Sequence, residues 1–132
     1  MEILPEYLDT VFHATPPEDG WPPLFFIITA CNPFSSGDRD GDDRSDSQLM
    51  EHLARLNLWR HRVVGASPDG RHREPGFAVS GIDRSAAAQL GALFLQKAIF
   101  EVDGDILRVV ACGSHSVREA GHFRGRLRGL DT

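Results

Sequence analysis

The sequence has few cysteines, no long apolar run and no excess of basic residues, and each shortage excludes a class of protein. The longest apolar run, near residues 24–31, is far shorter than the roughly 20 residues that a membrane span needs. The N-terminal residues MEILPEYLDT lack the basic and apolar regions of a signal peptide. An excess of 19 acidic over 14 basic residues argues against a general nucleic-acid binder. These shortages together predict a cytoplasmic protein with no membrane contact.

The two cysteines, Cys31 and Cys112, have neither a CxxC partner nor metal-ligand spacing. This favours two free, buried thiols in a reducing compartment, with a disulfide or a thiol nucleophile as the alternatives. What is present is an ordinary globular composition, with 41% hydrophobic and 25% charged residues among 132. We expect one domain over residues 1–112, with its core at about 23–112. Residues 113–132 are rich in glycine, serine, histidine and arginine, which predicts a flexible tail.

Apolar patterning predicts the main strands and helices. Residues 24–30 form a continuous run of aliphatic and aromatic residues, which is typical of a central strand buried on both faces. Ser45 and Gln48 fit a capping box, which predicts that the first helix begins at Ser45. Asp83 or Ser85 can cap a second helix. Further strands are expected at 62–66, 77–82, 98–102 and 106–111. Residues 6–14 fit a short helix or an edge strand equally well, and residues 15–20 predict a turn.

Turn residues separate these elements. The segment Ser67-Pro68-Asp69-Gly70 predicts a turn, and Asp103-Gly104 predicts a type I′ hairpin between the last two strands. The resulting order is strand, helix, strand, strand, helix, strand, strand. It predicts an α+β two-layer sandwich: a mostly antiparallel sheet of about five strands with two helices on one face. The arrangement would be ferredoxin-like, a split β-α-β motif with an added C-terminal hairpin strand.

Three segments carry a family resemblance. They are IITACNPFS at 27–35, SPDGRHREPGFAV at 67–79 and QKAIF at 96–100. Taken as an ordered set, they resemble DUF3293, a small bacterial family of unknown function, over roughly residues 23–112. The chain departs from that pattern at Cys31, where the family often has an aromatic residue. The resemblance implies a shared fold unit and a set of shared polar positions, and it implies no reaction.

Polar residues that follow or precede the expected strands are the candidate site. Strand ends that meet at one sheet edge are a common place for ligands, so we expect a binding site there. Glu74 would accept hydrogen bonds or act as a general base, and Asn32 and Gln96 would orient a polar ligand. The same residue types also stabilise turns and loop backbone, which is the structural alternative. The candidate binding residues are Asn32, Ser35, Asp69, His72, Glu74 and Gln96.

The pattern assigns no metal, no cofactor and no catalytic residue. Asp69, His72 and Glu74 match no known metal-ligand spacing, and Arg71 and Arg73 would repel a cation from His72. The chain also lacks a P-loop, a GxSxG elbow and a GxGxxG loop. We therefore expect a domain that binds a small polar ligand or a protein partner, and an exposed edge strand is compatible with a homodimer. The alternative is a small hydrolase or transferase with Glu74 as the general base, so the sequence leaves open whether the chain is an enzyme.

Overall fold

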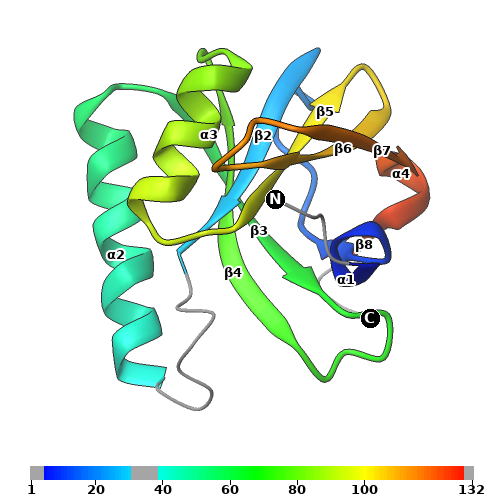
Figure 1. Cartoon of the computed structure of the whole chain (residues 1–132), viewed down its shortest axis with the longest axis horizontal. Coiled ribbons are helices and arrows are strands. Elements are labelled where there is room, and N and C mark those ends of the chain that lie inside the picture. The colour runs from blue at the N-terminus through cyan, green and yellow to red at the C-terminus, as the bar shows by residue number, and fades with distance from the viewer. Residues whose placement is uncertain (1–4, 31–38, 130–132) are drawn as a thin grey trace.

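The computed structural model describes residues 5–30 and 39–129, which form one curled sheet with two longer helices against it (Figure 1). No helix in these two ranges is long and apolar enough to cross a membrane. The elements in chain order are α1 (Pro5–Leu8), β1 (Val11–His13), β2 (Leu24–Thr29), α2 (Arg39–Arg55), β3 (Trp59–Ala66), β4 (Arg73–Ser80), α3 (Arg84–Leu93), β5 (Ala98–Asp103), β6 (Ile106–Ala111), β7 (Val117–His122), α4 (Phe123–Arg126) and β8 (Leu127–Arg128).

The sheet contains eight strands in the order β7-β6-β5-β2-β4-β3-β1-β8. Neighbouring strands are antiparallel except β1 and β8, which pair in parallel at one edge. The apolar run of residues 24–30 becomes β2, which is bonded on both sides, to β4 and β5. Phe25, Phe26, Ile27 and Ile28 are at most 1% exposed, which confirms the prediction of a central strand buried on both faces.

Successive residues of β2 alternate between two apolar cores, one on each face of the sheet. Phe26 and Ile28 face α2 and α3, where Leu49 and Leu53 of α2 complete the first core. Phe25 and Ile27 face the opposite side, where Phe12, Phe100 and Phe123 belong to the second core. Figure 1 shows α2 and α3 together on one side of the sheet and the short helices α1 and α4 on the other. The curled sheet is therefore covered on both faces.

The predicted five-strand sandwich with two helices, in a ferredoxin-like arrangement, is wrong. Three strands, β1, β7 and β8, extend the sheet to eight, and β1 with β8 makes it mixed. The largest change lies in the segment for which composition predicts a flexible tail. Residues 117–128 of that segment form β7, α4 and β8, and Phe123 is only 2% exposed in the second core. Nearly all of β7 is exposed, so it has no apolar alternation by which a sequence pattern reveals a strand.

Local signals predicted some element ends and missed others. Asp83 is the N-cap of α3, and its side chain accepts a hydrogen bond from the Ala86 amide at 2.8 Å, as predicted. The capping box at Ser45 is wrong, because α2 already begins at Arg39. The predicted β5–β6 hairpin forms, but its two loop residues are Gly104 and Asp105. Only Gly104 has a positive φ, of 66°, which fits a type II′ turn better than the predicted type I′.

Candidate functional site

Antiparallel pairing brings three polar side chains to the same end of the sheet. Thr29 is the last residue of β2, and it lies opposite Gly76 near the start of β4. Glu74 lies two residues before Gly76 on β4, and Gln96 precedes β5, which pairs with the other side of β2. Because β5, β2 and β4 are consecutive in the sheet, Gln96, Thr29 and Glu74 come from three neighbouring strand ends.

Hydrogen bonds join these side chains into what we call the strand-end cluster, formed by His72, Glu74, Thr29 and Gln96. The Thr29 hydroxyl donates to Gln96 Oε1 at 2.8 Å and lies 3.5 Å from Glu74 Oε2. His72 Nε2 lies 3.1 Å from Glu74 Oε1. A hydroxyl has a single proton, so the shorter contact makes Gln96 the main acceptor of Thr29.

Burial decreases steadily along the strand-end cluster. Gln96 and Thr29 are each 8% exposed, whereas the Glu74 side chain is 26% and the His72 side chain 76% exposed. Gln96 is also held by its Nε2, which donates to the Phe94 carbonyl at 3.2 Å. A buried polar pair thus supports a carboxylate that reaches solvent at the end of the sheet. A carboxylate offers about four lone-pair positions; His72 meets one of the two oxygens, and the Thr29 hydroxyl lies near the other.

Gly76 allows β4 to approach the end of β2 closely. A Cβ at this position would lie 2.4 Å from the Ile28 carbonyl oxygen and 2.8 Å from Thr29 Cγ2. No side chain fits in that space without moving the backbone of one of the two strands. The glycine therefore contributes to the site, because it sets the separation between the strand that carries Thr29 and the strand that carries Glu74.

Asp69, the remaining described candidate, belongs to the turn before β4. Its Oδ1 accepts hydrogen bonds from the Ser67 hydroxyl at 2.6 Å and from the Arg71 amide at 3.0 Å. The Ser67 hydrogen bond is the main cause that lowers the pKa of Asp69 below its ordinary value. The Gly70 amide donates to the Ser67 carbonyl at 2.9 Å, which confirms the predicted turn. Among the described residues, Asp69 contacts Ser67 and Arg71 and forms no hydrogen bond or ion pair with the strand-end cluster, so the geometry gives it a turn-forming role.

Two predicted site residues, Asn32 and Ser35, lie outside the described residues. Thr29 is the member of the strand-end cluster that the sequence does not single out, because it stands at the end of an apolar run that predicts a buried strand. The available signal was a hydroxyl at the end of a run that is otherwise buried, since such a hydroxyl requires a partner. Within residues 5–30 and 39–129, no group of three or more His, Cys, Asp or Glu side chains is placed to hold a metal ion.

A second polar cluster lies at the opposite end of β5 and concerns the stability of the fold. Glu101 is 3% exposed and binds the Arg84 guanidinium through both oxygens, at 2.7 and 2.9 Å. Arg108 Nη1 lies 2.9 Å from Glu101 Oε2 and 3.2 Å from Asp103 Oδ2. The Arg84 hydrogen bonds are the main cause that lowers the pKa of Glu101. The cluster attaches the first turn of α3 to β5 and β6.

Comparison with known proteins identifies the family from a segment that contains the strand-end cluster. The family model for DUF3293, described as a protein of unknown function, matches residues 28–99, which is more than half of the chain. The chain belongs to the DUF3293 family. The matched segment includes Thr29, Glu74, Gly76 and Gln96, so the strand-end cluster lies within the DUF3293 region. No curated protein and no solved structure matches the chain.

Proposed function

We propose that this DUF3293 domain binds a small polar ligand at the strand-end cluster, with Glu74 as the acceptor for a donor group of the ligand. The observation that carries the proposal is the continuous series of contacts from the buried Gln96 through Thr29 to the part-exposed Glu74. The His72 ring at 3.1 Å and the Thr29 hydroxyl at 3.5 Å restrict the orientation of the carboxylate before any ligand arrives. Such preorganisation lowers the entropic cost of binding.

The donor character of the ligand follows from the chemistry of Glu74. An ionised carboxylate only accepts hydrogen bonds, so the ligand group that meets it carries N–H or O–H donors. An ammonium or amidine group gains a charge-assisted bond, which is stronger than a neutral hydrogen bond. We therefore expect amines to bind more tightly than polyols. The proposal places this binding in the cytoplasm, in line with the buried, reduced thiol of Cys112.

The proposal is tested by NMR titration of the full chain with defined probes. Lysine, putrescine and glucose are added separately to the labelled wild type, to Glu74→Gln and to the control Glu119→Gln, which changes an exposed carboxylate on β7. We expect the amines to shift the amide signals of residues 29, 74 and 96, and we expect Glu74→Gln to weaken binding at least about tenfold. The melting temperature of Glu74→Gln reports separately whether the variant is folded.

Two results would contradict ligand binding at Glu74. One is the absence of a shift at the strand-end cluster with every probe at concentrations far above a millimolar dissociation constant. The other is a folded Glu74→Gln variant that binds the amines as tightly as the wild type. Loss of folding in Glu74→Gln would instead show that Glu74 is structural, and Glu74→Asp, which keeps the charge but withdraws the carboxylate by one methylene, then serves as the variant for the binding measurement.

One contact favours a second candidate function, that of a small hydrolase or transferase. His72 Nε2 lies 3.1 Å from Glu74 Oε1, and a carboxylate paired with an imidazole is a common arrangement for proton transfer. In this alternative Glu74 removes a proton from a substrate or from water. It predicts that an amine or alcohol derivative is turned over rather than only bound. Amide and ester derivatives of lysine are incubated with wild type and with His72→Gln, with water or a second amine as the acyl acceptor, and mass spectrometry of the released amine or alcohol distinguishes turnover from binding.

A further inference from the structure

Helix α3 ends in a turn that places a leucine where glycine is the usual residue. The Gln96 amide donates to the Gly91 carbonyl at 2.9 Å, and the Leu95 amide donates to the Ala92 carbonyl at 3.0 Å. This pair of bonds is a Schellman motif, whose C′ residue adopts the left-handed conformation. Here that residue is Leu95, with a φ of 63°. A Cβ is unfavourable in this conformation, so glycine would fit the turn better.

The Leu95 side chain does not contribute to the core in return. It is 63% exposed, and its neighbour Leu93 is 62% exposed. These two leucines are the most exposed large apolar side chains among the described residues. A leucine that strains the backbone and faces solvent brings no benefit to the isolated fold. A contact beyond the described residues would account for it.

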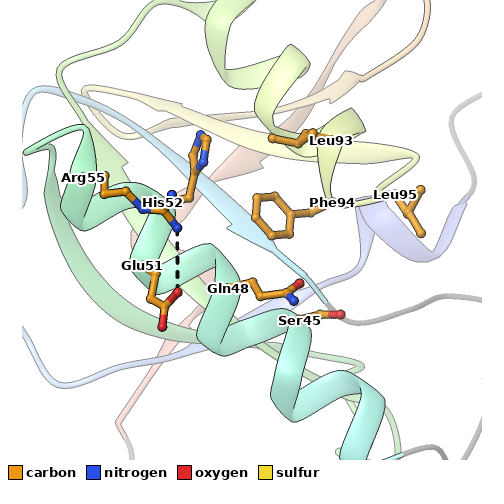
Figure 2. A pocket seen from close by; sticks show the side chains of 8 residues that line it. All are labelled: Ser45, Gln48, Glu51, His52, Arg55, Leu93, Phe94 and Leu95. Atoms are coloured by element: carbon orange, nitrogen blue, oxygen red, sulfur yellow. Dashed lines mark ion pairs between the residues drawn. The ribbon is translucent and has the colours of Figure 1, made fainter.

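The two leucines border a groove between α3 and α2 with a volume of about 510 Å³. Figure 2 shows the Phe94 ring facing the α2 side chains, with Leu93 and Leu95 beside it. Phe94 meets the His52 ring edge-on at 6.1 Å between centroids. The α3 side of the groove is apolar, whereas the α2 side is polar and consists of Ser45, Gln48, Glu51, His52 and Arg55.

We propose that this groove is the interface of a homodimer, in which Leu93 and Leu95 of each copy pack into the groove of the other. The charges on the groove favour a second copy as the occupant. Glu51 and Arg55 lie one helical turn apart, form an ion pair of 3.7 Å and are mostly exposed. When a twofold axis brings two α2 helices together antiparallel, Glu51 of each copy lies opposite Arg55 of the other. The surface is thus complementary to itself, as a twofold interface requires.

The same charges disfavour other occupants. A nucleic acid or an anionic membrane selects a surface with an excess of positive charge, whereas the one acidic and the one basic side chain on this groove cancel. The exposed apolar area is concentrated at the C-terminal end of α3 and is flanked by polar groups of α2. An apolar centre with a polar rim is the usual composition of a protein–protein interface.

Sedimentation velocity of the full chain over a range of concentrations tests the homodimer. We expect a concentration-dependent dimer in the wild type. Leu95→Gly should raise the dimer dissociation constant at least about tenfold, because it removes an apolar contact at the centre of the interface. The control is Met50→Ala, which shortens a similarly exposed apolar side chain of α2 that does not line the groove. The control should leave the dissociation constant unchanged.

Melting of Leu95→Gly separates the interface from the fold. When measured at concentrations where both proteins are monomers, the melting temperature of Leu95→Gly should equal or exceed that of the wild type. A second test reverses charge: Glu51→Arg should weaken the dimer, and the double variant E51R/R55E should restore it.

Any of three results would overturn the homodimer. The first is a wild type that stays monomeric at the highest concentration, which would leave the groove to a different partner or to none. The second is a dimer whose dissociation constant does not respond to Leu95→Gly. The third is a lower melting temperature for the monomer of Leu95→Gly, which would mean that the leucine serves the fold.

Discussion

The Thr29 hydroxyl lies 2.8 Å from Gln96 Oε1 and joins the end of β2 to the residue that precedes β5. Both side chains are 8% exposed, so water competes little for this bond. The bond therefore has two consequences: it supports the orientation of Glu74, and it contributes to the stability of the sheet.

A double-mutant cycle measures the bond between Thr29 and Gln96. Thr29→Val and Gln96→Leu each remove one side of a buried hydrogen bond, so each should lower the free energy of unfolding by about 1–3 kcal/mol. The double variant should be more stable than the sum predicts by about 1 kcal/mol, because it removes both polar groups together. Urea unfolding at neutral pH supplies the four free energies.

A control cycle uses Gln89, an exposed glutamine of α3, in place of Gln96. It combines Thr29→Val with Gln89→Leu. These two changes should be additive. Additive effects in the cycle of Thr29 and Gln96 as well would mean that their hydrogen bond makes no net contribution to stability.

The stability of the domain should depend on the ionisation of Glu101. Glu101→Gln removes the charge that Arg84 and Arg108 share in a buried position, which should lower the free energy of unfolding by about 3 kcal/mol at pH 7. The pKa of Glu101 is lowered in the folded state from an ordinary value of 4.5. Its stabilising effect is therefore complete above pH 4.5 and is lost as the pH falls through the lower folded pKa.

Urea unfolding of wild type and Glu101→Gln at a series of pH values from neutral to strongly acidic checks this dependence. The difference between the two proteins should shrink below pH 4.5. Asp103→Asn is the matched control, because the Asp103 side chain is 57% exposed and contacts only Arg108 of the pair. It should lower stability by less than about 1 kcal/mol. A constant difference between wild type and Glu101→Gln at all pH values would show that the charge of Glu101 is not responsible.

Phe123 should behave as a core residue although it lies in a segment with the composition of a tail. Its ring packs against Phe12, Trp21 and Phe25 at centroid distances of 5.7, 5.1 and 5.3 Å. Phe123→Ala should lower the free energy of unfolding by about 3–5 kcal/mol, and a chain that ends at Cys112 should not unfold cooperatively. Circular dichroism during thermal and urea unfolding measures both effects.

Val117→Ala on β7 is the control for Phe123→Ala, because Val117 is 38% exposed. This substitution should lower the free energy of unfolding by about 0.5 kcal/mol or less. If Phe123→Ala lowered stability no more than Val117→Ala, or if the shortened chain unfolded as cooperatively as the full chain, residues 113–129 would not be part of the folded core.

The sequence predicted the elements whose signals are local. The run from Phe25 to Ile28 identified a strand buried on both faces, and Asp83 identified the start of α3, because each signal involves neighbouring residues only. The edges of the sheet have no such signal. β7 is bonded to β6 yet exposed along most of its length, and Arg126 holds its segment through the carbonyls of Thr10 and Ala120 at 3.1 and 2.7 Å. A contact between residues so far apart in the chain, such as Arg126 and Thr10, leaves no periodic pattern in the sequence.

The candidate site was predicted only in part, because its local signals were visible in the sequence and its long-range contacts were not. Glu74 and Gln96 were expected at one sheet edge because they flank strands, and the structure places both in the strand-end cluster. Thr29, which lies between them, was not expected, because no sequence pattern tells which strand lies between β4 and β5. Asp69 was expected beside Glu74 because it is near in sequence, but the turn uses its carboxylate for its own backbone.

The parallel pair of β1 and β8 has a consequence for how the protein is made. Phe12 is in register with Leu127, and the Ala14 amide donates to the Arg128 carbonyl at 3.0 Å. A ribosome synthesises residue 12 long before residue 127, so β1 exists for most of the synthesis of this domain without its partner β8. This edge of the sheet therefore closes only after nearly all of the domain has been synthesised. During synthesis, the first strand of the domain must wait with its outer edge unpaired, which is the state in which strands are most exposed to aggregation.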